Sequence, residues 1–253
     1  MNKLTIAKKY FKYQRQDEAT WQIGKILTKT VVEIPARSGS SRIKDKNIRK
    51  IFGLPLIGYT IRLAKSLCNV DRVIVNTDSR EYADIAQSLG AEVPFLRPVE
   101  LAKDDTPPNW STFYLRRFLM DEDYPLKKLV TLMPTSPFRN KHLVERLISK
   151  LDTHYAVNTA YKINTSISSI YYPDMGGELQ TLNKYNALDD KMFFIKKMGM
   201  FTGCNVITGS GLRTYVHLIT SPVELIDIDT EQDIEAMKTI LKYNLYDFGC
   251  AIC

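Results

Sequence analysis

The chain alternates short apolar runs with amphipathic helical patterns, and this alternation constrains its fold more than any other feature. The apolar runs predict strands at Val31–Ile34, Arg72–Asn76, Ala91–Leu96 and Leu129–Met133. The amphipathic patterns predict helices at Leu54–Leu67, Glu81–Leu89, Trp110–Met120 and Leu143–Leu151. Such alternation predicts an α/β fold with a mostly parallel sheet, helices on both faces, and ligands at the carboxyl ends of the strands. Polar motifs follow three of these strands, in the loops around Arg37, Asp78 and Pro134.

The first predicted strand runs directly into a loop of small and basic residues, VVEIPARSGSSRIKDKN at Val31–Asn47. Its β-branched residues suit a buried strand, and Gly39 and Ser40 let a backbone pass close to a ligand. Positive charge then lies where a polyphosphate would bind, at Arg37, Arg42, Lys44 and Lys46. The stretch therefore predicts a nucleoside triphosphate cradle, although a surface loop with scattered cations would look the same. It lacks the spacing of a Walker loop and of a dinucleotide-binding loop.

Two aspartates near the end of the chain form the second strong signal, in the sequence Asp227-Ile228-Asp229. In an extended segment both carboxylates would point to the same face, because side chains alternate with period two. Two carboxylates with water and phosphate oxygens suit Mg²⁺, which would neutralise charge on a triphosphate. The alternative is a simple strand-to-helix turn in which Thr230 caps the following helix.

The regular alternation ends after Tyr161, and the later part of the chain reads differently. Residues 164–200 predict two strands around a turn marked by Pro173 and the Gly176–Gly177 pair. Strands at Cys204–Ile207 and Val223–Ile228 and a helix at Glu231–Leu241 then follow. We interpret the chain as one domain over residues 31–253 with an insert near 164–200. Residues 1–30 form an N-terminal extension, expected to be a helix or a partly disordered arm.

Composition favours a protein that binds small anions. The formal net charge of +7 over 253 residues suits nucleic acid, an anionic membrane or acidic small molecules. The chain has no long basic block and no RNA-binding signature, and no apolar run approaches the roughly 20 residues of a membrane span. Its four cysteines have no framework pattern, and the Cys250–Cys253 pair falls in an expected frayed tail. We therefore expect a cytoplasmic protein that binds neither nucleic acid nor membrane.

A family resemblance begins in the first loop. IPARSGSSRIKDKN followed by GLPLIGYTI resembles the opening of the cytidylyltransferases that activate acidic sugars, the CMP-sialic acid synthetase family. Further matches follow in that family's order, with VIVNTDSREYADIAQSLGAEV at Val73–Val93, FLRPVELAKD at Phe95–Asp104, MPTSPFR at Met133–Arg139 and DIDTEQD at Asp227–Asp233. Together they cover most of residues 31–243, which makes the resemblance far more specific than any single motif.

The resemblance implies a fold, a reaction and an assembly. The fold would be Rossmann-like and the protein a homodimer, in which the insert reaches the neighbouring subunit's site. The alternative for the insert is a local hairpin that covers the sheet of a monomer. In the reaction, the anomeric hydroxyl of an acidic α-keto sugar attacks the α-phosphate of CTP and pyrophosphate leaves. Such a step depends mainly on positioning and charge neutralisation.

Motif matching also assigns roles to residues. Those implied to hold the nucleotide are Ala36, Arg37, Gly39, Ser40, Arg42, Lys46, Asn47, Asp78 and Arg97. Those implied to line the acceptor pocket are Arg97, Thr106, Met133, Thr135 and Lys191. Arg37 and Lys46 would act in catalysis together with the metal ligands Asp227 and Asp229. Standing alone, Asp78 would be read as a helix N-cap and Arg97 as an exposed loop cation.

The chain departs from the family pattern at several places near the expected ligands. Family members usually carry lysine at the position of Ser41 and glutamine at that of Met133. They also carry an arginine-rich segment where this chain has DDKMFFIKK, and an asparagine-glycine pair where it has Thr202–Gly203. A thioether cannot replace an amide that hydrogen-bonds a sugar or ribose. The missing cation could come from Lys191, Lys196 or Lys197.

These departures leave three functions open. The first is a magnesium-dependent cytidylyltransferase for sialic acid or a related nonulosonic acid. The second is a cytidylyltransferase for the eight-carbon 3-deoxy-manno-octulosonic acid. The third is a non-catalytic relative that binds nucleotide or a protein partner.

Overall fold

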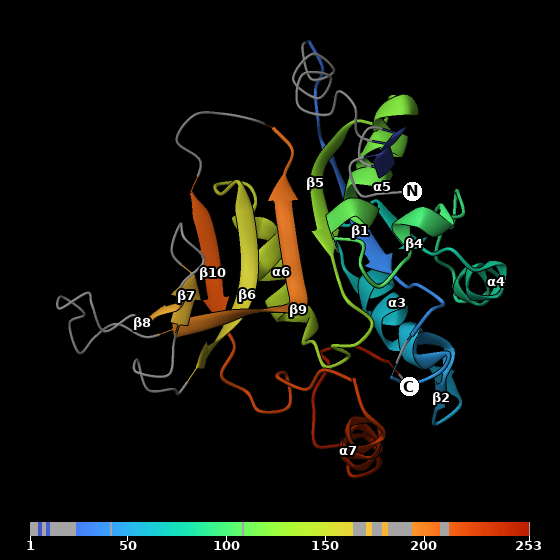
Figure 1. Ribbon diagram of the computed structural model, residues 1–253, viewed down its shortest axis with the longest axis vertical. Coiled ribbons are helices and arrows are strands. Elements are labelled where there is room, and N and C mark those ends of the chain that lie inside the picture. Colours follow the sequence, from blue (N-terminus) through green and yellow to red (C-terminus); the bar gives the residue numbers. More distant parts are fainter. Residues whose placement is uncertain are drawn as a thin grey trace.

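A computed structural model describes residues 5–6, 9–10, 24–40, 42–107, 109–163, 171–173, 179–181, 194–207 and 213–252. Its centre is a six-stranded sheet in the order β10-β6-β9-β5-β1-β4 (Figure 1). The strands are β1 (Lys29–Pro35), β4 (Arg72–Asn76), β5 (Leu126–Thr131), β6 (Ala156–Ile163), β9 (Phe194–Asn205) and β10 (Thr214–Leu218). β1 pairs in parallel with β4 and β5, and β6 with β10, whereas β9 runs antiparallel between β5 and β6. The predicted mostly parallel sheet is confirmed.

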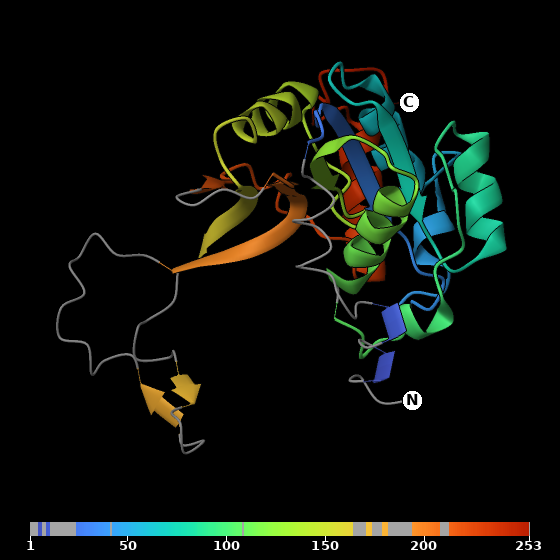
Figure 2. The same ribbon diagram turned by 90° about the horizontal axis from the view of Figure 1, so that it is seen from above.

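Helices cover both faces of this sheet, as predicted. They are α3 (Leu56–Ser66), α4 (Arg80–Ser88), α5 (Asn109–Asp121), α6 (Lys141–Lys150) and α7 (Glu231–Lys242). Neighbouring residues of β1 point to opposite faces: Val31 packs with Leu115 of α5, and Val32 lies in the larger core formed with α3, α6 and α7. The two views in Figures 1 and 2 show the same division, with α5 on one side of the sheet and α3 on the other.

Two predicted strands are wrong. In the segment Ala91–Leu96 only Glu92 pairs, through an isolated parallel bridge to Ile74, because Pro94 cannot donate to a ladder. The segment Val223–Ile228 begins as a turn, in which the Ile226 amide donates to the Val223 carbonyl. β6 and β10 were not predicted, since each becomes a strand through pairing with segments distant in sequence.

The chain between β6 and β9 lies largely outside the described residues. Within it, β7 (Tyr171–Pro173) and β8 (Leu179–Thr181) pair antiparallel, which confirms the two strands predicted there. Figure 2 shows this pair apart from the six-stranded sheet, beyond the long arm of β9.

Both ends of the chain have described residues that contact the main body. Near the start, Thr5, Ile6, Lys9 and Tyr10 are helical, and the Lys9 ammonium lies 3.2 Å from the Glu100 carboxylate. Near the end, Ile252 is only 3% exposed and its carbonyl accepts a hydrogen bond from Arg62. The expectation of a frayed tail is therefore wrong up to Ile252.

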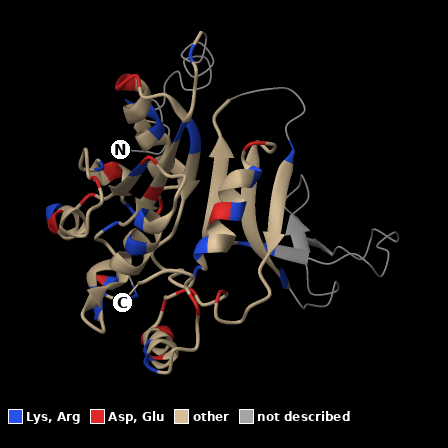
Figure 3. Cartoon of the chain, turned by 180° about the vertical axis from the view of Figure 1, so that it is seen from behind, with Lys and Arg blue, Asp and Glu red and all other residues tan. Residues whose placement is uncertain are grey.

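Charge is distributed over most elements. Figure 3 shows basic and acidic residues interleaved on the same helices and loops in that view. Among the described residues, no helix is long and apolar enough to cross a bilayer.

Candidate functional site

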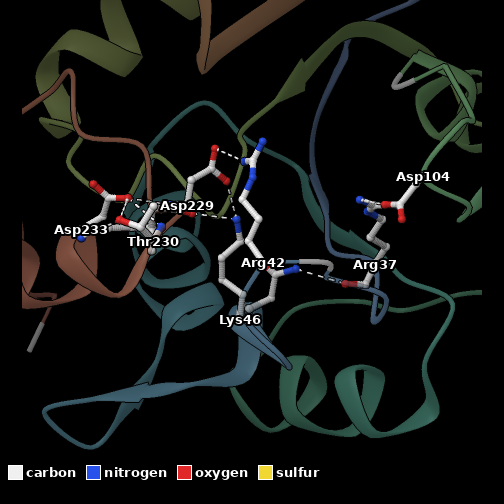
Figure 4. A network of polar contacts seen from close by, with 9 residues as sticks. Arg37, Arg42, Lys46, Asp104, Asp229, Thr230 and Asp233 are labelled. Carbon is white, nitrogen blue, oxygen red and sulfur yellow. Dashed lines mark hydrogen bonds and ion pairs between the residues drawn. The ribbon is translucent and has the colours of Figure 1, made fainter.

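The loop after β1 meets the segment before α7 at the carboxyl end of the parallel strands (Figure 4). The Lys46 ammonium donates to the Asp229 carboxylate at 2.8 Å and to the Ile228 carbonyl at 2.7 Å. The Arg42 guanidinium lies 2.6 Å from the other oxygen of Asp229. Two cations of the early loop and one late carboxylate thus lie at one place, although over 180 residues separate Lys46 from Asp229.

Local backbone geometry presents Lys46 to this cluster. Lys46 begins a short 3-10 helix, η1 (Lys46–Ile48), and the preceding Asp45 adopts the left-handed conformation with φ 51°. The Lys46 side chain is 9% exposed, so its charge is largely shielded from water. Partial burial opposes the ionisation of Asp229. The hydrogen bond from Lys46 and the charges of Lys46 and Arg42 outweigh burial and hold the pKa of Asp229 below its ordinary value.

A capping box fixes the backbone that carries Asp229. The Thr230 hydroxyl accepts from the Asp233 amide, and the Asp233 carboxylate accepts from the Thr230 amide at 2.7 Å. The same carboxylate accepts from the Asp229 amide at 3.0 Å. The interpretation of Thr230 as a helix cap is therefore right, and the cap positions the acidic segment.

Asp227 and Asp229 lie outside the strands of the sheet, on either side of the fully buried Ile228. Asp227 is exposed, whereas Asp229 is partly buried against the two cations. Among the described residues, no three His, Cys, Asp or Glu side chains gather in a metal-binding group. Mg²⁺ commonly uses only one or two carboxylates with water and phosphate oxygens, so the chemistry of this pair fits it.

Arg37 faces a different part of the site from Arg42. Its guanidinium forms an ion pair with Asp104, on the side of the loop away from Asp229 (Figure 4). The Arg37 carbonyl accepts from the Asn47 amide group at 3.3 Å, and the Asn47 carbonyl oxygen is buried without a partner in the structure. Ala36 is fully buried, and its amide donates to Asn76 at the end of β4. The loop is thus fastened at both ends.

Asp78 fastens the middle of the same loop. Its two carboxylate oxygens accept from the Ser38 amide at 3.0 Å and the Ser38 hydroxyl at 2.8 Å. The alternative reading of Asp78 as a helix cap is wrong, because Ser79 caps α4. The Ser40 amide donates to the Ser38 carbonyl, and a Cβ added at Gly39 would meet nothing within 4 Å. Open space beside Gly39 is what close approach of a ligand requires.

Arg97 is a buried cation with free donors. Only 5% of the residue is exposed, and its Nε and Nη2 atoms are buried without a hydrogen-bond partner. Its Nη2 atom forms an ion pair with the Asp78 carboxylate at 3.8 Å. The reading of Arg97 as an exposed loop cation is therefore wrong. Thr106 of the same region uses its hydroxyl to hydrogen-bond the Glu100 carbonyl, at 3.1 Å.

The motif after β5 packs against β9 and the acidic segment. The Met133 amide donates to the Gly199 carbonyl at 3.1 Å, and the Thr135 carbonyl accepts from the Ile228 amide at 2.7 Å. The fully buried Arg139 donates to the carbonyls of Met133 and Gly199, and burial lowers its pKa to about 9. These hydrogen bonds tie the motif to β9 and to the segment that carries Asp229. Ser41 and Lys191 lie outside the described residues.

Sequence reasoning missed Glu33, a carboxylate in the middle of β1. It is fully buried and accepts hydrogen bonds from Asn76, Thr112 and Thr131. The one sequence signal for Glu33 was an acidic residue inside the apolar, β-branched run VVEIP.

Comparisons with known proteins identify the family of the chain. The cytidylyltransferase family model matches residues 31–186, more than half of the chain. The N-acylneuraminate cytidylyltransferase of Escherichia coli is 36% identical over 140 residues, which cover 54% of this chain and 32% of that enzyme. A pseudaminic acid cytidylyltransferase of Campylobacter jejuni is 24% identical over 230 residues, which cover 85% of this chain and 97% of that enzyme.

A solved structure supports the fold. CMP:2-keto-3-deoxy-manno-octonic acid synthetase complexed with CTP superposes with a TM-score of 0.61 over 85% of this chain and 99% of that one, at 17% identity. The match to the E. coli enzyme spans about a third of that enzyme's length. On the strength of the family model and its agreement with the fold, the chain belongs to the cytidylyltransferase family.

Proposed function

We propose that this protein transfers CMP from CTP to an acidic α-keto sugar, sialic acid or a related nonulosonic acid, and releases pyrophosphate. The observation that carries the proposal is the meeting of Lys46 and Arg42 with Asp229 at the carboxyl end of the sheet. Cations and carboxylates at one edge are what a triphosphate with a divalent metal requires. Family membership and the names of the relatives support the same reading.

The nucleotide would lie over the loop after β1. Lys46 and Arg42 are within reach of phosphate oxygens, Gly39 leaves room for close approach, and Arg97 offers unpaired donors. Arg37, now paired with Asp104, would approach the nucleotide from the opposite side of the loop. The contribution of these residues is positioning and charge neutralisation at the reacting phosphate.

Mg²⁺ is the cofactor that we propose. Asp227 and Asp229 would hold it, with water and phosphate oxygens as the remaining ligands. Bound there, it supplies positive charge that stabilises the triphosphate during displacement. Calorimetry of CTP binding in magnesium and in EDTA tests this independently of turnover: tighter binding in magnesium is expected, and equal binding would contradict it.

The acceptor would bind near the motif after β5, with Met133 and Thr135 at its border. Met133 lies against β9 and offers a thioether where the family usually has an amide, so the acceptor contacts there differ from those of sialic acid enzymes. The solved eight-carbon sugar synthetase shares this fold, which keeps 3-deoxy-manno-octulosonic acid as the second acceptor to test.

The decisive experiment supplies purified protein with CTP, Mg²⁺ and a panel of nonulosonic and octulosonic acids, and measures pyrophosphate. Release with at least one sugar is expected, and release only with the eight-carbon acid would select that alternative. CTP binding without turnover would select the non-catalytic relative. Folded protein that neither binds CTP nor releases pyrophosphate would overturn the proposal.

Variants of the two aspartates test the acidic segment. Asp227→Asn and Asp229→Asn should each lower turnover by about 10²- to 10³-fold, because charge stabilisation at the reacting phosphate is lost. Asp152→Asn is the matched control: that carboxylate pairs with Lys127 and Lys128 near the start of β5, and its loss should leave turnover unchanged. Full activity in both site variants would remove the metal assignment.

A further inference from the structure

Glu33 is a fully buried carboxyl group that the proposed reaction does not use. Its side chain leaves the middle of β1 on the face covered by α5. One carboxylate oxygen accepts from the Asn76 amide group at 2.8 Å. The other accepts from the hydroxyls of Thr112 at 2.7 Å and Thr131 at 3.1 Å. A buried acid costs stability, so its presence in the centre of the sheet calls for a compensating role.

Glu33 holds the end of β4, from which two site residues are positioned. The Asn76 amide group that donates to Glu33 also donates to the Ser111 carbonyl at 2.9 Å, which fixes the last residue of the strand. The next residue, Thr77, accepts from the Arg97 amide at 2.7 Å. Asp78 then binds Ser38 in the loop after β1. One carboxylate therefore supports both Arg97 and the predicted phosphate loop.

Arg97 lies between competing charges. Burial, the largest effect, and the nearby Arg37 lower the pKa of Arg97, and the carboxylates of Asp78 and Glu33 offset this only in part. The ion pair of Nη2 with Asp78 stays at 3.8 Å, beyond hydrogen-bond distance, and the buried Nε and Nη2 atoms have no hydrogen-bond partner. The hydrogen bonds from Asn76 to Glu33 and from the Arg97 amide to the Thr77 carbonyl hold the backbone that sets this separation. Without Glu33 that backbone would shift, and the Arg97 guanidinium would close onto Asp78. Its donors would then be occupied, and Asp78 would be drawn away from Ser38.

We propose that Glu33 is a positioning residue that keeps the guanidinium of Arg97 open for the nucleotide. This inference rests on the nucleotide site of the proposed function. It concerns a residue that touches neither nucleotide nor sugar and acts through Asn76 and Arg97.

The charge of Glu33 gives the proposal a pH signature. Burial raises its pKa, and the hydrogen bonds from Thr112, Asn76 and Thr131 and the charge of Arg97 oppose that rise. The groups that contact it from β4, β5 and α5 are neutral, and the charged group acting on it is Arg97. Raising the pH through this pKa ionises Glu33 and should strengthen CTP binding.

Calorimetry of CTP binding tests the proposal without any sugar. Glu33→Gln should weaken CTP binding about tenfold and remove the part of the pH dependence due to Glu33, a comparison that cancels the titration of CTP itself. In an Arg97→Met background the same substitution should have no further effect. Asp71→Asn is the matched control, because its carboxylate binds Thr30 and Lys29 at the opposite end of the sheet. It should leave CTP affinity unchanged.

Thr112→Val gives a second route should Glu33→Gln fail to fold. It removes a hydrogen bond that favours the ionised carboxylate, so the strengthening of CTP binding should shift to higher pH and recover there. Unchanged CTP affinity in Glu33→Gln, or an unshifted profile in Thr112→Val, would overturn the role of Glu33. Wild-type protein that fails to bind CTP would overturn the proposed function first and this inference with it. CTP binding without sugar turnover would leave the role of Glu33 standing.

Discussion

At the scale of single residues, Gly199 of β9 packs directly against Met133. A Cβ added to Gly199 would lie 2.5 Å from Met133 Cγ and 3.0 Å from its Cβ, neither of which is the free end of the side chain. Gly199→Ala should therefore lower the free energy of unfolding by about 1–3 kcal/mol. Adding Met133→Ala should recover part of this loss. Urea unfolding measures both.

Gly39→Ala is the matched control for this clash, because its added Cβ meets open space. Its stability should stay within about 0.5 kcal/mol of wild type. Equal stability of Gly199→Ala and wild type would contradict the predicted clash and show that the backbone of β9 shifts to accommodate the added Cβ.

Glu33 predicts an unusual pH dependence of stability. Its pKa is raised in the folded state, so the folded state binds the proton more tightly than the unfolded chain does. The stability linked to this group is fully present below the unfolded pKa, near 4.5, and is lost as the pH rises through the raised folded value. Unfolding measured across this range should show wild type losing stability relative to Glu33→Gln as the pH rises. A difference in unfolding free energy between wild type and Glu33→Gln that stays constant with pH would contradict the raised pKa of Glu33.

At the scale of elements, the capping box of α7 joins helix stability to the site. Thr230→Ala removes the hydroxyl that caps the helix and should cost about 1 kcal/mol of unfolding free energy. Thr239→Ala on the same helix is the control, since its hydroxyl bonds only the Glu235 carbonyl within the helix. It should cost less than about 0.5 kcal/mol. Equal losses in a denaturation series would show that the cap contributes nothing particular.

At the scale of the whole molecule, removing the insert tests whether it mediates dimer formation. Ile163 at the end of β6 pairs with Phe194 at the start of β9, so an Asn-Gly turn can join them in place of residues 164–193. We expect wild type to sediment as a homodimer, as the family resemblance implies, and the shortened chain as a monomer that still binds CTP. A shortened chain that remains dimeric, or a wild type that is monomeric, would contradict the role of the insert.

The sequence alone determined the repeating pattern of the fold. Apolar periodicity is local, so it placed β4 at Arg72–Asn76 and located five helices to within a few residues. The positions of the loops around Arg37, Asp78 and Pro134 followed from the rule that ligands meet at the carboxyl ends of parallel strands. Their motifs also carried the family resemblance, which the family model now supports.

Tertiary structure decided which residues meet and which are buried. Asp229 was expected to serve a metal, and its contacts with Lys46 and Arg42 depend on segments more than 180 residues apart. Arg97 is buried and Glu33 carries hydrogen bonds from three elements, which no local pattern reveals. Strand pairing also decided that residues 91–96 form only an isolated bridge and that β6 and β10 are strands. Periodicity reports the neighbours along the chain, whereas burial, pairing and charge contacts depend on neighbours that only folding brings together.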